Sequence, residues 1–343
     1  MKDNAGKRPS VCICGGGNLG LVCAGFIASA SYKVNVLTGK PEKWSQTVEV
    51  TDPEGRVFSG VLNKVSDKAR DVIEDVDLIL ITVPGHLIEK TLLNIKPFLG
   101  KNAIVGSIVA NTGFFFLAEK ILGRNHRLFG FQRVPFIGRV ETYGRRARLL
   151  GYKKELKVYI EGSDKEEVRG VLEEMFATRV RLLNSHYEVS LSNSNPILHT
   201  GRLYSIWGPE SKDSVAKSKY FYKDWDNKSS EIVLGMDKEF MAIVDKLNIP
   251  HESICSLKDY YECEDVESFT DKIRNIPAFM TIKTPLIETS DGLKPDLESR
   301  YFVEDFMCGL SFIVKAAKKL QMEIPLIEKV YDWGLDFMNK KEL

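Results

Sequence analysis

Short apolar runs alternate with amphipathic stretches over the first half of the chain, from residue 11 to about residue 183. This alternation is typical of βαβ units and predicts a mostly parallel sheet with helices between several of its strands. We expect strands at residues 11–14, 33–38, 78–83, 103–108, 127–131, 156–160 and 179–183. After the second of these, two β-prone runs flank Asp-Pro-Glu-Gly, a turn sequence that predicts an inserted hairpin.

The pattern changes near Leu183, where apolar residues begin to recur at helical spacing. Ser185 followed by Glu188 is typical of a capping box, which predicts a long helix beginning here. We therefore predict an α/β Rossmann-like parallel-sheet domain at residues 1–184 and an all-helical domain at residues 185–343.

An aromatic segment separates the first two helices expected in the second domain. It covers about residues 207–230 and carries Tyr220, Phe221, Tyr222 and Trp225, which is too aromatic for a plain linker. Ordinary packing against the domain is the favoured interpretation, and a lid or substrate-side loop is the alternative.

The composition agrees with a folded protein of about two domains. The 343 residues are 43% apolar and 28% charged, which disfavours disorder and fibrous architectures. The formal net charge of +1 offers no overall attraction for nucleic acid or an anionic membrane. The first ten residues lack the apolar core of a signal peptide, and no apolar run approaches the length of about 20 residues that a membrane helix needs. We expect a cytoplasmic protein with neither a nucleic-acid nor a membrane partner.

The six cysteines are scattered and show no metal-binding spacing. We therefore expect free thiols and no structural metal.

A glycine motif follows the first predicted strand directly. The sequence Gly15-Gly16-Gly17-Asn18-Leu19-Gly20 fits the GxGxxG pattern of dinucleotide-binding folds. Gly15 permits a tight turn, Gly17 lets the backbone approach a pyrophosphate, and Gly20 lets the helix pack on the strand. Asn18 and Leu19 open that helix, whose N-terminal amides and dipole attract an anion. Glycine-rich turns also occur for steric reasons alone, but here strand, helix and second strand fall where a dinucleotide site requires them.

The residues after the second predicted strand bear on the choice of cofactor. An NAD site normally has an acid here, which bonds the adenine ribose. This chain has Thr38 and Lys40 instead, followed by Lys43, a set that suits a 2′-phosphate, so NADP(H) is favoured. NAD(H) remains the alternative if the glutamate between the two lysines takes the acid's role. Val83 and Pro84, at the end of a later strand, are expected to line the cofactor crevice.

A polar stripe begins the second domain. Ser192, Asn195, His199 and Arg202 are spaced so that they share one face of a helix. The pattern alone favours a solvent-facing stripe. Pro196 lies among them, and inside a helix it is expected to remove a hydrogen bond and kink the axis beside the histidine.

An acidic pair occurs in the last third of the chain. Glu304 and Asp305 can be first-turn acids that favour a helix dipole. Alternatively, Asp305 holds His199 in one tautomer and stabilises its protonated form, as general acid–base catalysis requires. Only the fold can bring these two residues together.

With these motifs in view, the chain resembles the octopine/nopaline dehydrogenase family, the opine dehydrogenases. The resemblance rests on the glycine motif, Asn195-Pro196-x-x-His199 and Arg300-Tyr-x-x-Glu-Asp305, and spans nearly the whole length. It implies a helical domain like the C-terminal domain of 6-phosphogluconate dehydrogenase. It also implies reductive condensation of an amino acid amine with a 2-oxo acid, using NADH or NADPH. By that resemblance His199 matches the catalytic histidine and Asp305 its carboxylate partner. Arg300 matches the arginine that engages the oxo-acid carboxylate, and Asn195 is expected to contact substrate.

Two rival functions remain open at this point. A ketopantoate-reductase-like or other hydroxyacid dehydrogenase shares the Rossmann domain, but such reductases use a lysine early in the second domain. Between Arg181 and Arg202 this chain has no lysine. A non-catalytic NAD(P) sensor is the second rival, and the presence of both His199 and Asp305 argues against it. A homo-oligomer is possible in each case.

Overall fold

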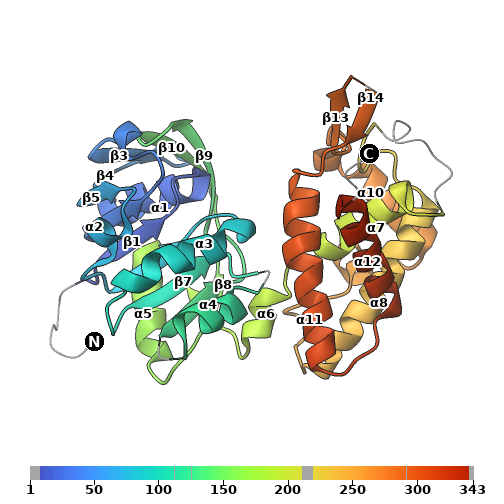
Figure 1. Ribbon diagram of the computed structural model, residues 1–343. Coiled ribbons are helices and arrows are strands. Elements are labelled where there is room, and N and C mark those ends of the chain that lie inside the picture. Colours follow the sequence, from blue (N-terminus) through green and yellow to red (C-terminus); the bar gives the residue numbers. More distant parts are fainter. Residues whose placement is uncertain (1–7, 112, 125, 211–218, 291, 340–343) are drawn as a thin grey trace. The chain divides into compact units, whose positions relative to one another are not determined.

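The computed structural model describes residues 8–111, 113–124, 126–210, 219–290 and 292–339 (Figure 1). The chain divides into two compact units, Met1–Ser190 and Leu191–Leu343. The short helix α6 (His186–Ser190) belongs to the first unit, so this division falls one short helix after the expected boundary at residue 184.

The first unit is built around a mostly parallel sheet with strand order β12-β11-β8-β7-β6-β1-β2-β5. β1 lies between β2 and β6 and runs parallel to both, whereas β11 runs antiparallel to β8. The strands are β1 (Val11–Cys14), β2 (Val34–Leu37), β5 (Lys64–Ser66), β6 (Leu78–Ile81), β7 (Ile104–Ile108), β8 (Arg127–Phe131), β11 (Leu156–Ile160) and β12 (Val180–Leu182). The predicted parallel-sheet domain is confirmed. β5 was not predicted, because a three-residue edge strand leaves little periodic signal.

Helices cover both faces of this sheet, which explains why its central strands are apolar on both sides. Val11 and Ile13 face the core that includes α1 (Asn18–Ser29) and α5 (Lys165–Phe176). Cys12 and Cys14 face the opposite core. That core includes α2 (Ala69–Ile73), α3 (Gly85–Ile95) and α4 (Phe114–Leu122). All six cysteines are free, as expected.

A smaller sheet packs against α1, with strand order β4-β3-β10-β9. Its strands are β3 (Thr47–Thr51), β4 (Val57–Val61), β9 (Phe136–Thr142) and β10 (Arg146–Tyr152). β3 and β4 form the predicted inserted hairpin. The close approach of this sheet to α1 requires glycine, because a Cβ on Gly60 would lie 2.5 Å from the carbonyl oxygen of Gly25.

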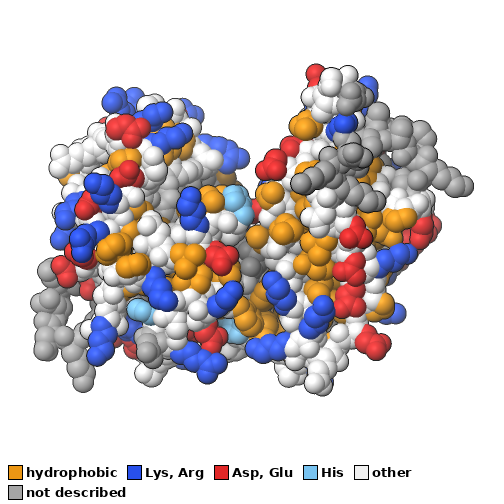
Figure 2. Space-filling model, in the orientation of Figure 1, with side chains coloured by type: hydrophobic (Ala, Val, Ile, Leu, Met, Phe, Trp, Pro, Cys, Tyr) orange, Lys and Arg blue, Asp and Glu red, His pale blue; other side chains and the backbone are white. Residues whose placement is uncertain are grey.

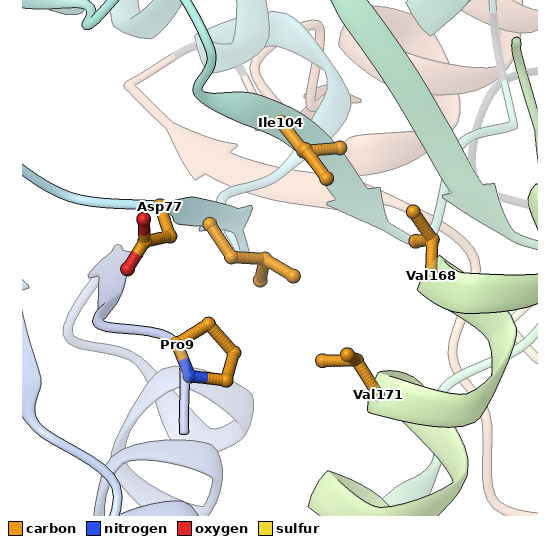
Figure 3. A pocket seen from close by; sticks show the side chains of 6 residues that line it. Pro9, Asp77, Ile104, Val168 and Val171 are labelled. Atoms are coloured by element: carbon orange, nitrogen blue, oxygen red, sulfur yellow. The ribbon is translucent and has the colours of Figure 1, made fainter. Parts of the chain in front are cut away.

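A small apolar hollow lies at the amino ends of the central strands (Figure 3). It is lined by Pro9, Asp77, Leu78, Ile104, Val168 and Val171. The carboxylate of Asp77 accepts hydrogen bonds from the backbone and the hydroxyl of Ser10. Since ligands of such sheets bind at the carboxyl ends of the strands, this hollow is a packing feature of the opposite end.

The second unit is helical, as predicted. Its helices are α7 (Asn195–Trp207), α8 (Asn227–Lys246), α9 (Leu257–Tyr261), α10 (Val266–Asn275), the π-helical segment η4 (Tyr301–Leu310), α11 (Ser311–Lys319) and α12 (Pro325–Asn339). A short helical turn, η3 (Pro277–Phe279), also lies in this unit. Two others, η1 (Pro41–Lys43) and η2 (Lys96–Phe98), lie in the first unit. The structure adds a hairpin that was not anticipated, β13 (Leu286–Thr289) and β14 (Gly292–Pro295). In the described part of the chain, no helix is both long and apolar enough to span a membrane.

Two glycines let the helices of the second unit pack closely. A Cβ on Gly309 of η4 would lie 2.2 Å from Cγ of Pro196, and one on Gly201 would lie 2.7 Å from a methyl of Val233. α7 is therefore held tightly between α8 and η4. On the visible faces of both units, Lys and Arg side chains are interspersed with Asp and Glu (Figure 2), in agreement with the net charge of +1.

Candidate active site

The glycine turn joins β1 to α1 at the carboxyl end of the central strands. Gly15 has a φ of 128°, which side-chain-bearing residues rarely adopt. A Cβ on Gly20 would lie 1.9 Å from the carbonyl oxygen of Gly15, so only glycine fits there. A Cβ on Gly17, in contrast, would meet nothing within 4 Å. The space beside Gly17 is thus open on the side where a pyrophosphate would approach.

The N-terminus of α1 is available to an anion. Gly17 is the N-cap, no side chain caps the helix, and its first turn contains no acid. Its amides and dipole can therefore bind a phosphate. The side-chain oxygen of Asn18 instead accepts a hydrogen bond from the backbone of Val140, which ties the turn to β9. Leu19 is half-buried and packs on the core of the first unit.

The end of β6 lies beside the glycine turn. The Thr82 hydroxyl donates to the carbonyl of Cys14 at 3.1 Å. A Cβ on Gly15 would lie 3.1 Å from a methyl of Val83, and Pro84 is the N-cap of α3. The structure thus places Val83 and Pro84 at the switch point between β1 and β6, where such sheets bind ligands.

The end of β2 meets the tip of the β9–β10 hairpin. The Thr38 hydroxyl is buried and lies 3.0 Å from the hydroxyl of Tyr143. Lys40 and Lys43 are exposed on either side of the following turn. Gly144, with a φ of 71°, packs against the backbone of Lys43. Sequence reasoning missed Tyr143, because a distant hairpin brings it to Thr38 at the end of β2. Taken together, these residues fit a dinucleotide.

In the second unit, His199 lies on α7 with both ring nitrogens engaged. Nδ1 lies 2.7 Å from Oδ2 of Asp305, and Nε2 lies 2.6 Å from the hydroxyl of Tyr222. The exposed fractions are 4% for His199, 3% for Asp305 and 4% for Tyr222. With a carboxylate on Nδ1, that nitrogen carries a proton, so in the neutral ring Nε2 is the nitrogen that accepts one.

Asp305 reaches His199 from η4, in which the wider π-helical winding places it one turn after Tyr301. Such winding is rare and often occurs at functional sites. The Tyr301 ring lies 4.7 Å from the His199 ring, and the Phe221 ring lies 5.6 Å away. The histidine is therefore enclosed by aromatic rings in addition to its two polar partners.

Tyr222 was the residue of this cluster least visible in the sequence. The interpretation that its segment packs against the domain is confirmed for the described residues 219–230, since Phe221, Tyr222 and Trp225 are buried; residues 211–218 lie outside the described part of the chain. Burial raises the pKa of Tyr222 well above its usual range, with a further rise from Tyr301 and Tyr261. Its hydroxyl thus stays protonated at neutral pH. The cluster of aromatic residues in this segment was the only signal in the sequence, and it did not single out Tyr222.

The polar stripe does not face solvent, and that interpretation is wrong. Ser192, His199 and Arg202 are buried. His199 and Arg202 lie on α7, which packs against α8 and η4. The single long helix expected from Ser185 is also interrupted: α6 ends at Ser190 and α7 begins at Asn195. Pro196 therefore lies in the first turn of α7, where its missing N–H costs nothing and no kink is needed.

The two predicted substrate residues, Asn195 and Arg300, differ in how buried they are beside His199, Asp305 and Tyr222. Asn195 is the first residue of α7, one turn before His199, and is half-buried. Arg300 is exposed immediately before η4. Its positive charge lowers the pKa values of Tyr222 and Tyr301, opposing their burial. Arg300 is thus close enough to act electrostatically on the cluster around His199.

A turn that fits a dinucleotide and a buried His–Asp pair are features expected of an NAD(P)-dependent oxidoreductase. Comparison with known proteins agrees. Residues 182–338 match the family model "NAD/NADP octopine/nopaline dehydrogenase, alpha-helical domain", and residues 11–130 match the model "Ketopantoate reductase PanE/ApbA". The helical part of the chain is thus similar to that of the octopine/nopaline dehydrogenase family.

Individual relatives cover nearly the whole chain. An uncharacterized protein of Sinorhizobium fredii is 28% identical over 96% of this chain and 95% of its own length. An octopine dehydrogenase of Mizuhopecten yessoensis is 24% identical over 96% of this chain and 90% of its own length. A solved octopine dehydrogenase in complex with NADH and L-arginine shares the fold, with a TM-score of 0.81 at 21% identity. That match covers 98% of this chain and 91% of the other.

Proposed function

We propose that this protein is an NAD(P)H-dependent opine dehydrogenase that condenses the amine of an amino acid with a 2-oxo acid. The observation that carries the proposal is the buried contact between His199 and Asp305. Acid–base catalysis at neutral pH needs a histidine whose tautomer is fixed and whose protonated form is stabilised. The carboxylate on Nδ1 supplies both.

The first unit is proposed to hold the cofactor. Gly15, Gly17 and Gly20 shape the pyrophosphate turn, and α1 supplies its N-terminal amides. When bound, the reduced nicotinamide supplies the hydride that reduces the condensed substrate. We favour NADPH over NADH, because Thr38 follows β2 where an NAD site has an acid, and Lys40 and Lys43 are exposed after it.

The second unit is proposed to supply proton transfer and substrate binding. Protonated His199 drives the loss of water from the carbinolamine formed by amine and oxo acid, while Asp305 stabilises the imidazolium. Arg300 is proposed to bind the oxo-acid carboxylate, since a guanidinium can make two parallel hydrogen bonds to it. Asn195, one turn before His199, is proposed as a further polar contact to substrate.

A ketopantoate-reductase-like activity is the second candidate, favoured by the match over residues 11–130. That match covers only the cofactor domain, which both classes share. The helical domain separates the two candidates. Its first helix presents His199 rather than a lysine, and its match over residues 182–338 is to the octopine/nopaline family. A cytosolic location agrees with six free cysteines.

Incubating the protein with NADPH or NADH and a matrix of 2-oxo acids against amino acids tests the proposal. We expect cofactor oxidation that requires both an oxo acid and an amino acid. Oxidation with an oxo acid alone would instead support the hydroxyacid dehydrogenase. Cofactor binding without oxidation in the presence of any tested pair would support the non-catalytic sensor.

A further inference from the structure

His199 has no free nitrogen to offer a substrate directly. Nδ1 is bonded to Asp305, and Nε2 is 2.6 Å from the hydroxyl of Tyr222. A proton leaving His199 for a substrate must therefore pass through the Tyr222 hydroxyl, unless Tyr222 first moves away.

The ring of Tyr222 is packed between other aromatic rings. It stacks on Phe279, with ring centroids 4.2 Å apart and an interplanar angle of 20°. On the same segment, the Trp225 ring is stacked at 6.1 Å. With the side chain only 4% exposed, moving it would disrupt both contacts.

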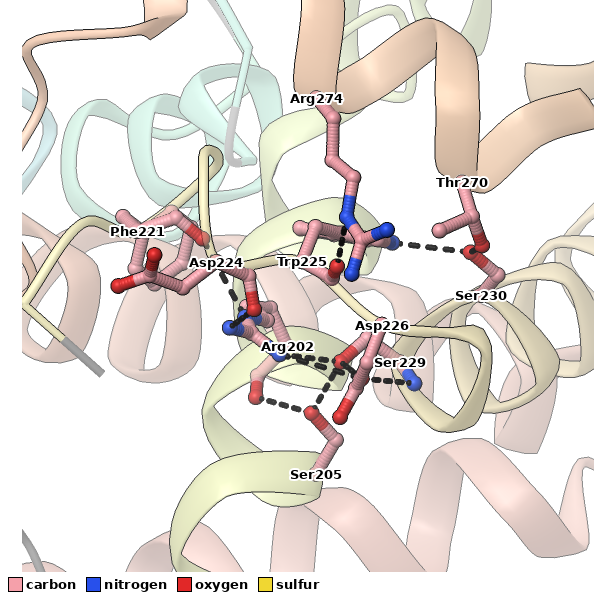
Figure 4. Close-up of polar contacts among 10 residues, drawn as sticks. All are labelled: Arg202, Ser205, Phe221, Asp224, Trp225, Asp226, Ser229, Ser230, Thr270 and Arg274. Atoms are coloured by element: carbon pink, nitrogen blue, oxygen red, sulfur yellow. Dashed lines mark hydrogen bonds and ion pairs between the residues drawn. The ribbon is translucent and has the colours of Figure 1, made fainter. Parts of the chain in front are cut away.

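The backbone on both sides of Tyr222 is also held in place (Figure 4). The buried guanidinium of Arg202, one helical turn after His199 on α7, donates to the carbonyl of Asp224 at 2.6 Å and to that of Phe221 at 3.3 Å. It also donates to the hydroxyl of Ser229 at 2.6 Å. Arg274 donates to the carbonyl of Trp225. Burial lowers the pKa of Arg202 to about 10, so it keeps its charge at neutral pH.

We propose that Tyr222 is a catalytic residue whose hydroxyl relays the proton from Nε2 of His199 to the substrate, and that Arg202 is the positioning residue that keeps it there. This proposal rests on the proposed function. A hydroxyl is suited to the task, because it can accept one proton while it donates another.

In the proposed relay step, the carbinolamine loses water while two protons move. The C–O bond breaks, and its electron pair leaves with the hydroxyl oxygen, which takes the Tyr222 proton and departs as water. Tyr222 regains a proton from Nε2 of the protonated His199. The nitrogen lone pair forms the C=N bond, and His199 ends neutral. No oxidation or reduction occurs in this step.

Tyr222→Phe tests the relay, because it removes the hydroxyl and keeps the stacked ring. The probes are pyruvate and the amino acid that turns over fastest with it in the wild type. We expect kcat to fall about 10² to 10⁴-fold, the usual contribution of general acid catalysis, with KM values and cofactor affinity near wild type. Tyr204→Phe is the matched control: it is another buried tyrosine of the second unit, whose ring packs on Trp333, and it should keep wild-type kcat.

A solvent-isotope measurement separates a relay from a structural role. In the wild type, the single-turnover rate should depend on the deuterium fraction along a curve, because two protons move in one step. The same plot should be a straight line for Tyr222→Phe. A straight line in the wild type would contradict the relay.

The outcomes distinguish the relay from the function on which it rests. If the wild type fails to oxidise cofactor with any tested pair of substrates, the proposed function fails, and the relay fails with it. If the wild type turns over and Tyr222→Phe matches or exceeds its kcat, only the relay fails, and Tyr222 merely occupies Nε2.

Discussion

Nδ1 of His199 lies 2.7 Å from Oδ2 of Asp305, although 106 positions separate the two residues. The contact exists because α7 and η4 are packed together where Gly309 meets Pro196. It places a carboxylate on one side of the imidazole and leaves the other nitrogen to Tyr222. The pair is therefore built for one tautomer, which is the property on which the proposed acid–base role depends.

Replacement of His199 or Asp305 should slow turnover without preventing cofactor binding. We expect His199→Ala to lose about 10² to 10⁴-fold in kcat, and Asp305→Asn to lose activity because an amide can favour the wrong tautomer. Since the two residues act as a unit, the double variant should be little worse than His199→Ala. Steady-state kinetics on the four proteins provide the test. Losses that multiply would mean that Asp305 has an independent role, such as stabilising η4.

Gly17→Ala should weaken cofactor binding and leave the fold intact. The added methyl meets nothing of the protein within 4 Å, so it occupies only the space proposed for the pyrophosphate. We expect affinity for both cofactors to fall about tenfold or more, equivalent to about 1.4 kcal/mol, at unchanged Tm. Gly170→Ala on α5 is the control: it also meets nothing within 4 Å and should raise stability by about 0.5–1 kcal/mol. Unchanged affinity in Gly17→Ala would place the cofactor elsewhere.

Removal of the two lysines after β2 should change cofactor preference. In the Lys40→Ala/Lys43→Ala variant, the Kd for NADPH should rise about tenfold while that for NADH changes little, because only NADPH carries a 2′-phosphate. The control removes two exposed lysines elsewhere on the first unit, Lys101 and Lys120. Titration of each protein with NADPH and with NADH measures the two Kd values. Tighter binding of NADH than NADPH by the wild type would contradict the preference itself.

Arg202→Lys should act on turnover through Tyr222. The ammonium group keeps the charge but loses the planar fork that reaches Phe221 and Asp224. We expect kcat to fall in the wild-type background and to stay unchanged when the substitution is added to Tyr222→Phe. A double-mutant cycle on kcat measures this coupling. Equal losses in both backgrounds would indicate a general structural role for Arg202.

Asp237 should make the fold less stable as pH rises. Burial on α8 raises its pKa from 3.8 to about 6, so the folded state binds a proton that the unfolded state has lost between these values. The resulting destabilisation grows between pH 4 and 6 and persists above pH 6, up to about 3 kcal/mol at 1.4 kcal/mol per pKa unit. Asp237→Asn can still accept the hydrogen bond from the backbone of Leu257. Urea unfolding should show it more stable than wild type at pH 8 and equal at pH 4; no difference at pH 8 would contradict this.

The local parts of the fold and site could be predicted from the sequence. The glycine turn, the central strands and the β3–β4 hairpin depend on neighbouring residues, and each leaves a period or a turn signal. The break between α6 and α7 was not predicted, because helical spacing continues through Ser192, and a proline at position 196 is compatible with a kink inside a longer helix. In physical terms, Pro196 is better placed in a first turn.

The tertiary parts of the site had no comparable signal. The pattern predicts that Arg202 and Ser192 face solvent, because a polar face looks the same in sequence whether water or a buried hydrogen-bond network satisfies it. Tyr222 and Tyr143 reach their partners only through loops. The pairing of Asp305 with His199 stayed an alternative in the sequence, since 106 positions separate the two residues and only tertiary packing brings them together.

The most direct test of the account follows cofactor oxidation in the substrate matrix, in wild type and His199→Ala, and identifies the product by mass spectrometry. We predict that the wild type forms a secondary amine containing both carbon skeletons, only when amino acid and 2-oxo acid are present together. His199→Ala should form it about 10² to 10⁴-fold more slowly. Formation of a 2-hydroxy acid instead, or a fully active His199→Ala, would contradict the account.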